Sequence, residues 1–381
     1  MKVAIINTLY HPNRLGGAEL SVQLLAEELV KNGSEVLVLT LHSEGIIRRD
    51  LVNGVNVTYL PLLNVYWPYN NKRQNVFMKL IWHANDFYNF RMIKSVENEI
   101  DLFQPDIVHT NNLSGFSMGI WLSLKKKGIH IVHTARDYYM FHPNSTLFKN
   151  GICMSMNNPI VRVNRYFKSR MSKGVDAFIG ISSYVSELHK SYGFAPNGFH
   201  SFVYNPINKI EHNRVSDNKL TIGFIGRLTA DKGFDQFINS AALYSDKFNF
   251  IAAGKPDASE QSEELVDKAI KCGVQVLGFV PAEIFFDKID ILLLPTKWNE
   301  PFGRVVAEAA VAGIPVYTNY IGGIKEIASF FEWVRDIKYF NEPEMNEIVK
   351  SARMSVIKMD NPFNINDHVS RYMEIYGKII S

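Results

Sequence analysis

Short apolar runs alternate with amphipathic segments along the first half of the chain. Three of these runs, Lys2–Asn7, Val36–Thr40 and Asp106–His109, have the length and apolar content of buried parallel strands. Between the first two, Glu19–Asn32 carries apolar residues at helical spacing, and Gly33 follows it as a stop signal. A strand, a helix and a second strand in this order form one β/α/β unit. The pattern therefore predicts parallel sheets flanked by helices.

The same rhythm begins again after residues 205–218, which are polar and contain proline. Leu220–Ile225, Phe248–Ala253 and Ile289–Leu294 are again short and apolar. A chain of 381 residues is long for one hydrophobic core and suits two domains. We therefore predict an α/β protein with two Rossmann-like β/α/β domains and a final amphipathic helix, with bounds 1–206, 207–362 and 363–381.

Composition and charge narrow the class of protein. The apolar fraction of 46% is ordinary for a soluble globular protein, and a net charge of +3 is too weak to indicate a nucleic-acid partner. Cys153 and Cys272 lie far apart in the sequence, so we expect no disulfide framework, a reducing cytoplasm, and a buried thiol at Cys153. The first residues, MKVAIIN, do not resemble a signal peptide, and no apolar run is long enough to span a bilayer.

The stretch from Pro295 to Pro315, PTKWNEPFGRVVAEAAVAGIP, holds the strongest candidate chemistry. Pro301 suits the first turn of a helix, and Arg304–Ala312 is apolar on nearly every face, which predicts a buried helix. Glu308 lies in the middle of it, and a buried carboxylate needs a hydrogen-bonding partner. Arg304, four residues earlier, is the one local candidate.

A second acid, Glu300, precedes the start of this helix near Gly303. The free N–H groups and the positive end of the dipole make a helix N-terminus a site for anions. The layout therefore indicates a cleft that holds a phosphate together with a polyol. The simpler alternative is that Glu300 caps the helix and Glu308 only pairs with Arg304.

These residues resemble the signature of the retaining glycosyltransferases of family 4, which is E-P-F-G-x-x-x-x-E-A. The match comprises Glu300, Pro301, Phe302, Gly303, Glu308 and Ala309, and it continues through Gly313, Pro315, Gly322, Gly323 and Glu326. The resemblance implies the GT-B fold, in which two Rossmann-like domains face a cleft and the C-terminal helix crosses back to the first domain. It also implies that Glu300 contacts the transferred sugar, that Glu308 binds the ribose of the donor, and that Gly303 and Arg304 belong to the donor site.

Two further loops fit the same resemblance. Arg227 and Lys232 flank a strand-to-helix turn after Leu220–Ile225, where two cations suit a diphosphate, and they match the family's G-R-L-x-x-x-K-G loop. Their alternative role is that of solvated surface charges. The Gly16–Gly17 pair matches a family loop, G-G-A-E, whose backbone approaches the donor phosphates or the acceptor; we expect Gly17 on the donor side and Gly16 on the acceptor side.

Two candidate strands of the first domain end in a histidine, one at His109 and the other at His133. The carboxyl end of a strand in an open sheet faces the cleft, so we expect His133 to point toward it. The resemblance implies that a histidine at this place lies near the reacting sugar, and we expect His109 on the acceptor side. Many family members have His-Asp-Tyr where this chain has Arg136-Asp137-Tyr138. Either His133 or the Arg136–Asp137 pair therefore occupies the reaction centre, unless His133 is simply a core histidine. His130 and His133 lie on opposite faces of a strand, which argues against a metal there.

With the resemblance, the sequence therefore predicts a transferase that moves a sugar from a nucleotide-diphosphate donor, a UDP-sugar or GDP-mannose, to a glycan or lipid-linked glycan, and the resemblance implies that it is a retaining enzyme. Bacterial surface polysaccharide synthesis (O-antigen, capsule or lipopolysaccharide) is the family's commonest setting. The chain has no Asp-x-Asp, and we expect neither a metal nor another cofactor. The alternatives are a sugar-nucleotide epimerase and a sugar-nucleotide-binding protein without activity. A nicotinamide dehydrogenase is disfavoured because G-x-G-x-x-G is absent from the first turn.

Two segments, Tyr66–Lys94 and Ile160–Lys173, interleave aromatic residues with lysine and arginine. Such segments are attracted to an anionic membrane surface, and aromatic side chains can lie at its headgroup level. This composition predicts a cytoplasmic enzyme that contacts the inner face of the membrane. The alternative is that the aromatic residues belong to the core and the basic residues are only solvated.

Overall fold

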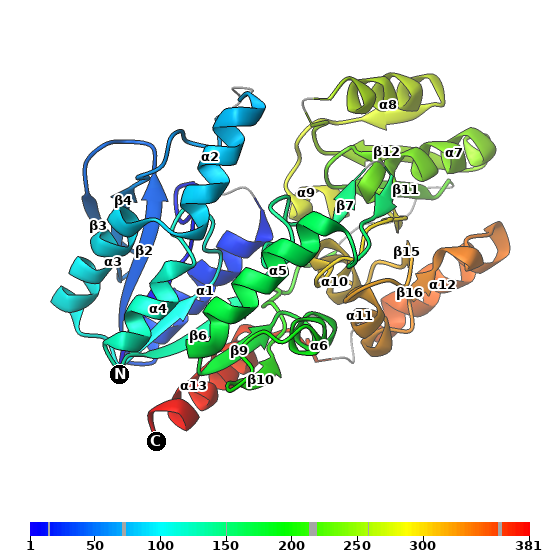
Figure 1. Cartoon of the computed structure of the whole chain (residues 1–381). Coiled ribbons are helices and arrows are strands. Elements are labelled where there is room, and N and C mark those ends of the chain that lie inside the picture. Colours follow the sequence, from blue (N-terminus) through cyan, green and yellow to red (C-terminus); the bar gives the residue numbers. More distant parts are fainter. Residues whose placement is uncertain (14–15, 71–73, 150, 213–218, 258, 357–359) are drawn as a thin grey trace. The chain divides into compact units, whose positions relative to one another are not determined.

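The computed structural model describes residues 1–13, 16–70, 74–149, 151–212, 219–257, 259–356 and 360–381. Parts of two segments discussed above, 71–73 and 213–218, therefore lie outside the described residues. The chain forms two compact units (Figure 1). The first unit comprises Met1–Thr146, Ser155–Pro206 and Ile365–Ser381, and the second comprises Leu147–Met154 and Ile207–Asn364. Residues 147–154, which the sequence placed within the first domain, thus belong with the second unit.

The first unit is built on an eight-stranded sheet with the order β10-β9-β6-β5-β1-β2-β4-β3. Neighbouring strands are parallel except β3 and β4, which are antiparallel. The sequence pattern did not predict β3, because most of its residues are exposed on the sheet edge and lack an apolar run. The strands are β1 (Lys2–Ile6), β2 (Glu35–His42), β3 (Arg48–Val52), β4 (Val55–Pro61), β5 (Ile107–Thr110), β6 (His130–Ala135), β9 (Ala177–Gly180) and β10 (Phe199–Phe202).

Polar side chains define several helix ends in the first unit. Ser182 accepts a hydrogen bond from the Val185 N–H and caps α6, as Ser, Thr, Asp and Asn commonly do. Asn89 accepts a hydrogen bond from the Met92 N–H and caps α3. The helices are α1 (Gly17–Lys31), α2 (Val76–Phe87), α3 (Phe90–Phe103), α4 (Gly119–Lys126), α5 (Pro159–Met171), η1 (Ser172–Gly174), α6 (Ser183–Ser191) and α13 (Ile365–Ile380).

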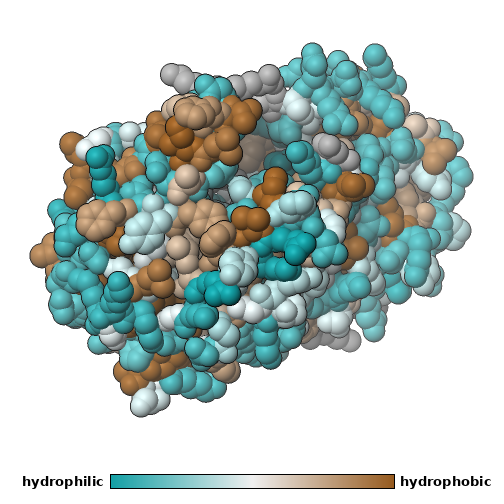
Figure 2. Space-filling view, viewed as in Figure 1, coloured by the Kyte–Doolittle hydropathy of each residue, from teal (hydrophilic) through white to brown (hydrophobic). Residues whose placement is uncertain are grey.

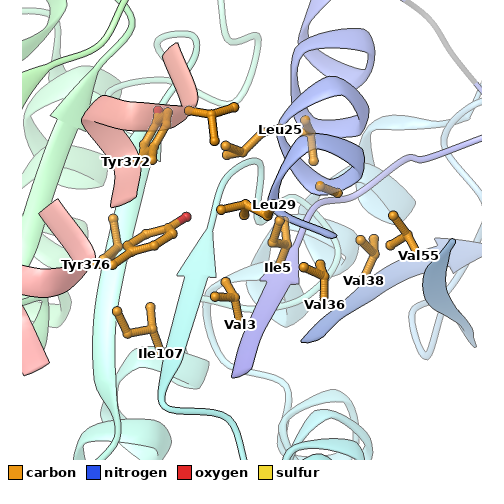
Figure 3. Close-up of a cluster of buried hydrophobic side chains, with 14 of the residues drawn as sticks. Val3, Ile5, Leu25, Leu29, Val36, Val38, Val55, Ile107, Tyr372 and Tyr376 are labelled. Carbon is orange, nitrogen blue, oxygen red and sulfur yellow. The ribbon is translucent and has the colours of Figure 1, made fainter. Parts of the chain in front are cut away.

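The C-terminal helix α13 completes the core of the first unit. Its Tyr372 and Tyr376 project toward the sheet and lie in one buried cluster with side chains of β1, β2 and α1, among them Leu25 and Leu29 (Figure 3). Both tyrosines are inaccessible to solvent. Fully burying an apolar side chain contributes about 1.5–3 kcal/mol, so this helix is an integral part of the unit.

The second unit carries a six-stranded, wholly parallel sheet with the order β13-β12-β11-β14-β15-β16. Its strands are β11 (Thr221–Ile225), β12 (Asn249–Ala253), β13 (Val274–Val276), β14 (Ile291–Leu294), β15 (Val316–Thr318) and β16 (Val334–Asp336). Its helices are η2 (Ala230–Lys232), α7 (Phe234–Tyr244), α8 (Glu260–Lys271), α9 (Ala282–Phe286), α10 (Arg304–Val311), α11 (Ile324–Phe330), η3 (Ile337–Tyr339) and α12 (Glu342–Val356). A short hairpin, β7 (Phe148–Lys149) and β8 (Ile152–Cys153), belongs to this unit.

Two sequence-based expectations are wrong in the second unit. Cys153 is exposed rather than buried, because it lies on the β7–β8 hairpin. Pro301 lies outside α10, which begins at Arg304 with Gly303 as its N-cap. The helix itself has the predicted burial, since Val306, Ala307, Ala309 and Ala310 are inaccessible to solvent.

Candidate functional site

The strand order of the second unit reverses between β11 and β14, and ligands of open parallel sheets bind at such a switch point. The loop after β11 carries Arg227 and Lys232, and the loop after β14 carries Glu300. The two loops are tied together, because Lys297 N–H donates to the Asp231 carbonyl at 2.8 Å. Gly233 has φ +80° and a Cβ there would lie 1.9 Å from the Pro295 carbonyl oxygen, so this approach requires glycine.

Glu300 is 8% exposed and lies at the centre of this loop pair. Its Oε1 accepts a hydrogen bond from Lys232 Nζ and a second one, of 2.9 Å, from Trp298 Nε1. The Lys232 ammonium also lies 4.7 Å from the centroid of the Trp298 ring. The alternative that Glu300 caps α10 is wrong, since Gly303 is the N-cap and the Glu300 carboxylate bonds Lys232 and Trp298 instead.

Arg227 differs from Lys232 in its exposure. Its guanidinium pairs with Asp231 at 2.7 Å, and 51% of its side chain is exposed, against 18% for Lys232. The two predicted diphosphate cations therefore lie on the same loop, one at the surface and one against the Glu300 carboxylate. An anion that binds here must compete with Asp231 and Glu300 for them.

Glu308 projects from the second turn of α10 and bonds Arg304 Nε at 2.8 Å. Burial raises the pKa of the Glu308 carboxyl, and the Arg304 guanidinium opposes this increase. The pairing that the sequence suggested is therefore present. The pair lies close to the start of α10. The backbone just before this helix is held by the loop after β15, because Gly323 N–H donates to the Glu300 carbonyl at 2.8 Å. A Cβ at Gly322 would lie 2.4 Å from the same carbonyl oxygen, which explains the glycine pair.

The first unit holds a buried arginine at the carboxyl edge of its sheet. Arg136, the first residue after β6, is 7% exposed. Its Nε donates to Asn111 Oδ1 and its NH1 donates to Asn205 Oδ1, both at 2.8 Å. Asn111 directly follows β5 and Asn205 lies soon after β10. Neither asparagine was identified from the sequence, although a polar residue just beyond a buried strand is the signal that marks Arg136.

Asp137 lies beside this arginine, and its Oδ1 accepts the Tyr139 N–H at 2.7 Å. Burial raises the pKa of Asp137 to about 6. Deeper in the unit, Lys168 Nζ donates to the Tyr139 carbonyl at 2.7 Å, and the Tyr139 hydroxyl donates to Asp86. Burial lowers the pKa of Lys168 to about 8, although Asp86 and Asp137 act against it. These contacts connect the loop after β6 to α2 and α5.

The two candidate histidines do not reach the edge of the sheet. His109 is inaccessible to solvent, with Nδ1 2.7 Å from the Tyr376 hydroxyl of α13 and Nε2 2.8 Å from Thr134 Oγ1. Its placement on the acceptor side is therefore wrong. His133 is 1% exposed and its ring packs against Trp121 and Phe178.

Burial lowers the pKa of both histidines well below the usual value and keeps them neutral. Of the alternatives left open by the sequence, the structure favours a core role for His133, and it leaves Arg136 and Asp137 as the candidates near the sheet edge.

The glycine pair of the first unit lies at the start of α1, in the connection that follows β1. Gly16 is the N-cap, and its N–H donates to Glu19 Oε2 at 3.0 Å; Gly17 is the first helical residue. Residues 14–15, immediately before the pair, lie outside the described residues. Helix starts at the carboxyl edge of a parallel sheet expose N–H groups, so this position is compatible with a bound anion.

Comparisons with known proteins agree with this geometry. Residues 15–209, more than half of the chain, match the family model Glycosyltransferase Family 4, and residues 207–350 match Glycosyl transferases group 1. A protein in the cps region of Klebsiella pneumoniae is 40% identical, over 99% of this chain and 100% of its own length. The GPI3 subunit of phosphatidylinositol N-acetylglucosaminyltransferase from Saccharomyces cerevisiae is 24% identical, over 85% of this chain and 69% of that protein.

Solved structures share the fold at low sequence identity. Sucrose-phosphate synthase from Thermosynechococcus elongatus superimposes with a TM-score of 0.68 at 14% identity, covering 99% of this chain and 98% of that one. Anabaena HepE, solved in complex with UDP and glucose, also gives a TM-score of 0.68, at 15% identity and with 99% and 100% coverage.

The fold and the family matches define a glycosyltransferase with the GT-B fold, which confirms the predicted fold class. Within that class, the chain belongs to Glycosyltransferase Family 4. In the part of the chain that the structure describes, no helix is both long enough and apolar enough to span a membrane.

Proposed function

We propose that this glycosyltransferase takes its sugar from a nucleoside diphosphate donor, a UDP-sugar or GDP-mannose, and transfers it with retention to a glycan or lipid-linked glycan. The observation that carries the proposal is the convergence of Lys232, Glu300 and the α10 N-terminus at the switch point of the second unit. HepE was solved with UDP-glucose, and the cps-region relative supports a setting in surface polysaccharide synthesis.

The leaving diphosphate acquires negative charge as the glycosidic bond breaks. Lys232, Arg227 and the N–H groups near Gly303 stabilise that charge electrostatically, without a divalent metal in this proposal. Glu300 contacts the sugar hydroxyls and Glu308 the ribose of the donor. We assign no carboxylate of the first unit's described residues as a nucleophile, so in this proposal the acceptor hydroxyl attacks on the face that the phosphate leaves, and the departing phosphate takes its proton.

Arg136 and Asp137 are the proposed groups of the first unit at the reaction centre. Arg136 is held by two amide oxygens, so its guanidinium is fixed in orientation before a ligand binds. The raised pKa of Asp137, about 6, lets its carboxyl exchange protons near neutral pH. Gly16 and Gly17 would contribute backbone N–H groups to the acceptor and the donor, respectively.

A nucleotide-binding experiment tests the donor half of this proposal. UDP and GDP are titrated into the whole chain by calorimetry, and Glu308→Gln is compared with Glu263→Gln, a matched change on the exposed face of α8. Losing a charged acceptor for the ribose hydroxyls weakens binding by roughly 1.5–3 kcal/mol, or about 10- to 150-fold, whereas the control stays within twofold. Unchanged affinity in a folded Glu308→Gln protein would contradict the role of Glu308.

Product analysis separates transfer from the epimerase and binding-protein alternatives. An epimerase would convert the sugar nucleotide without an acceptor, and a binding protein would leave it intact. The proposed transferase releases the nucleoside diphosphate only when an acceptor is present. Proton NMR of the first product shows an α-linkage from an α-linked donor; a β-linkage would reject retention.

The acceptor half of the proposal is that the enzyme docks on an anionic membrane to reach a lipid-linked glycan. The alternative that the aromatic and apolar residues of these segments belong to the core is wrong for several side chains of α2 and α5, which are exposed. It is correct for Trp82, which is only 4% exposed. A hydrophobic patch is visible over α2 in Figure 2. The exposed residues, each with at least half of its surface accessible, are Val76, Phe77, Leu80, Ile160, Val163, Tyr166 and Phe167.

Charge on α5 complements such a surface. The helix contains no acidic residue, and Arg162 and Arg170 are exposed beside the apolar side chains. Phe87 of α2 and Phe167 of α5 meet edge to face with ring centroids 6.1 Å apart, so the two helices are neighbours. Lys168, which the sequence counted among the basic residues of this segment, is only 2% exposed and takes no part.

Vesicle sedimentation tests the docking surface. Each basic residue near an anionic surface contributes about 1 kcal/mol, so Arg162→Ser with Arg165→Ser and Arg170→Ser weakens binding to phosphatidylglycerol vesicles strongly at low salt. The control removes three exposed lysines of the second unit, Lys268, Lys271 and Lys288. Equal, negligible binding of the wild type to anionic and neutral vesicles would contradict docking on a membrane and favour a soluble acceptor.

A further inference from the structure

Trp298 is a buried aromatic residue in the loop after β14, and it contacts both Glu300 and Lys232. It is 7% exposed. Its indole N–H donates to Glu300 Oε1 at 2.9 Å, and its ring face lies under the Lys232 ammonium, 4.7 Å from the centroid. One rigid side chain therefore contacts both the carboxylate and the cation of the site.

We propose that Trp298 is a positioning residue: its indole N–H holds Glu300 for the transferred sugar, and its ring face holds Lys232 for the diphosphate. The inference rests on the proposed function and assigns a role to a residue outside the matched signature. Both hydrogen bonds to the Glu300 carboxylate reach Oε1. In the described part of the chain no donor is found for Oε2, so that oxygen can accept from a sugar hydroxyl.

When the donor binds, the hydrogen bond from the Trp298 indole becomes the main contact that holds the Glu300 carboxylate. A diphosphate draws Lys232 toward its own oxygens and weakens the ion pair with Glu300. The carboxylate then depends on the Trp298 N–H, which does not compete for the phosphate because it is buried beneath the ammonium. A hydrogen bond to a charged acceptor is among the stronger ones in proteins, so it can fix the carboxylate while Lys232 changes partner.

The backbone around Trp298 is held by contacts that do not involve the indole. Lys297 N–H donates to the Asp231 carbonyl, and Lys297 Nζ pairs with Asp235 at 2.5 Å. On the hairpin side, Cys153 Sγ lies 3.5 Å from the Lys297 carbonyl oxygen. A change confined to the indole can therefore remove its hydrogen bond without releasing the loop, which makes the role of the N–H measurable.

Three replacements of Trp298 separate its two contacts. Trp298→Phe keeps an aromatic face and removes the N–H; Trp298→Leu removes both. Benzothienylalanine at this position keeps the shape of tryptophan without a ring N–H, so it serves if Trp298→Phe folds poorly. For each protein, calorimetry gives the affinity for UDP and GDP and for the corresponding sugar nucleotides, and steady-state kinetics gives kcat and KM.

Loss of the N–H should affect the sugar and spare the nucleotide. In Trp298→Phe and the benzothienylalanine protein, nucleoside diphosphate affinity stays within twofold, while kcat/KM falls by about 10- to 100-fold. Trp298→Leu additionally weakens nucleoside diphosphate binding several-fold. In a Glu300→Ala background, Trp298→Phe lowers the affinity for the sugar nucleotide by no more than twofold, because the acceptor that the N–H holds is already gone.

Two results would overturn the inference. One is wild-type kcat/KM in the folded benzothienylalanine protein. The other is an equal loss of sugar-nucleotide affinity from Trp298→Phe in the wild-type and in the Glu300→Ala backgrounds, which would show that the indole acts only by packing. Failure of the wild-type chain to bind any nucleoside diphosphate would instead contradict the proposed function, so the two failures are distinguishable.

Discussion

The Lys232–Glu300 pair offers a test that separates stability from donor binding. The two side chains are only 18% and 11% exposed. Breaking a fully buried pair by removing one partner costs about 3–5 kcal/mol, because a charge is left without compensation. Here the remaining exposure and the Trp298 N–H soften that penalty, so we expect Lys232→Met to destabilise the second unit by about 2 kcal/mol.

Removing both charges should reverse most of this loss. In the double variant Lys232→Met with Glu300→Gln, no uncompensated charge remains, and replacing both partners of a buried pair is often nearly neutral. For a unit of this size, about 2 kcal/mol corresponds to roughly 4–8 °C in the unfolding midpoint. The double variant should therefore regain most of the midpoint that Lys232→Met loses, while its affinity for UDP or GDP stays low.

Differential scanning calorimetry of the ligand-free chain, with nucleotide titration of the same samples, measures both quantities. The control is Lys247→Met with Glu342→Gln, a pair whose side chains are 50% and 44% exposed. Because surface pairs contribute little, this control should move the midpoint by less than about 2 °C singly or together. If Lys232→Met is as stable as the wild type, or if the double variant recovers nucleotide affinity, the reasoning about this pair is refuted.

Three further measurements follow from the structure. Burial lowers the pKa of Lys168 to about 8, below its value of 10.5 in the unfolded chain, so stability rises between these pH values; Lys168→Met should abolish that rise in denaturation curves. Tyr376→Phe leaves His109 Nδ1 without its hydroxyl partner and should cost about 1–3 kcal/mol in the same assay. Transfer should persist in excess chelator, yet be abolished in a folded Arg227→Ala/Lys232→Ala protein; loss that manganese restores would contradict it.

The apolar runs predicted the central strands of both sheets because a strand buried on both faces has to be apolar along its length. The elements that escaped prediction lack this signature. β3 is a polar edge strand, β16 has only three residues, and the β7–β8 hairpin has two per strand. The hairpin also packs with the second unit although its neighbours in sequence belong to the first, and such a crossing leaves no mark in local periodicity.

The sequence located the charged residues of the loops after β11 and β14, because each loop lies in one short stretch of sequence. It did not pair them. Lys232 and Glu300 come from loops after different strands, and only the adjacency of β11 and β14 brings them together. Trp298 was overlooked for the same reason: an aromatic residue two positions before Glu300 has no evident role until Lys232 is placed over its ring.

The histidines of the first unit show how the end of a strand decides whether a residue can reach a ligand. The sequence placed the strand ends at His109 and His133, but β5 continues to Thr110 and β6 to Ala135. Inside a strand, side chains alternate between the two faces, so His109 turns toward α13 and His133 toward α4. The residues just beyond these two strand ends, Asn111 and Arg136, lie at the carboxyl edge of the sheet, and Arg136 donates a hydrogen bond to Asn111. An error of one or two residues in a strand boundary therefore exchanges a residue at the carboxyl edge of the sheet for a core histidine.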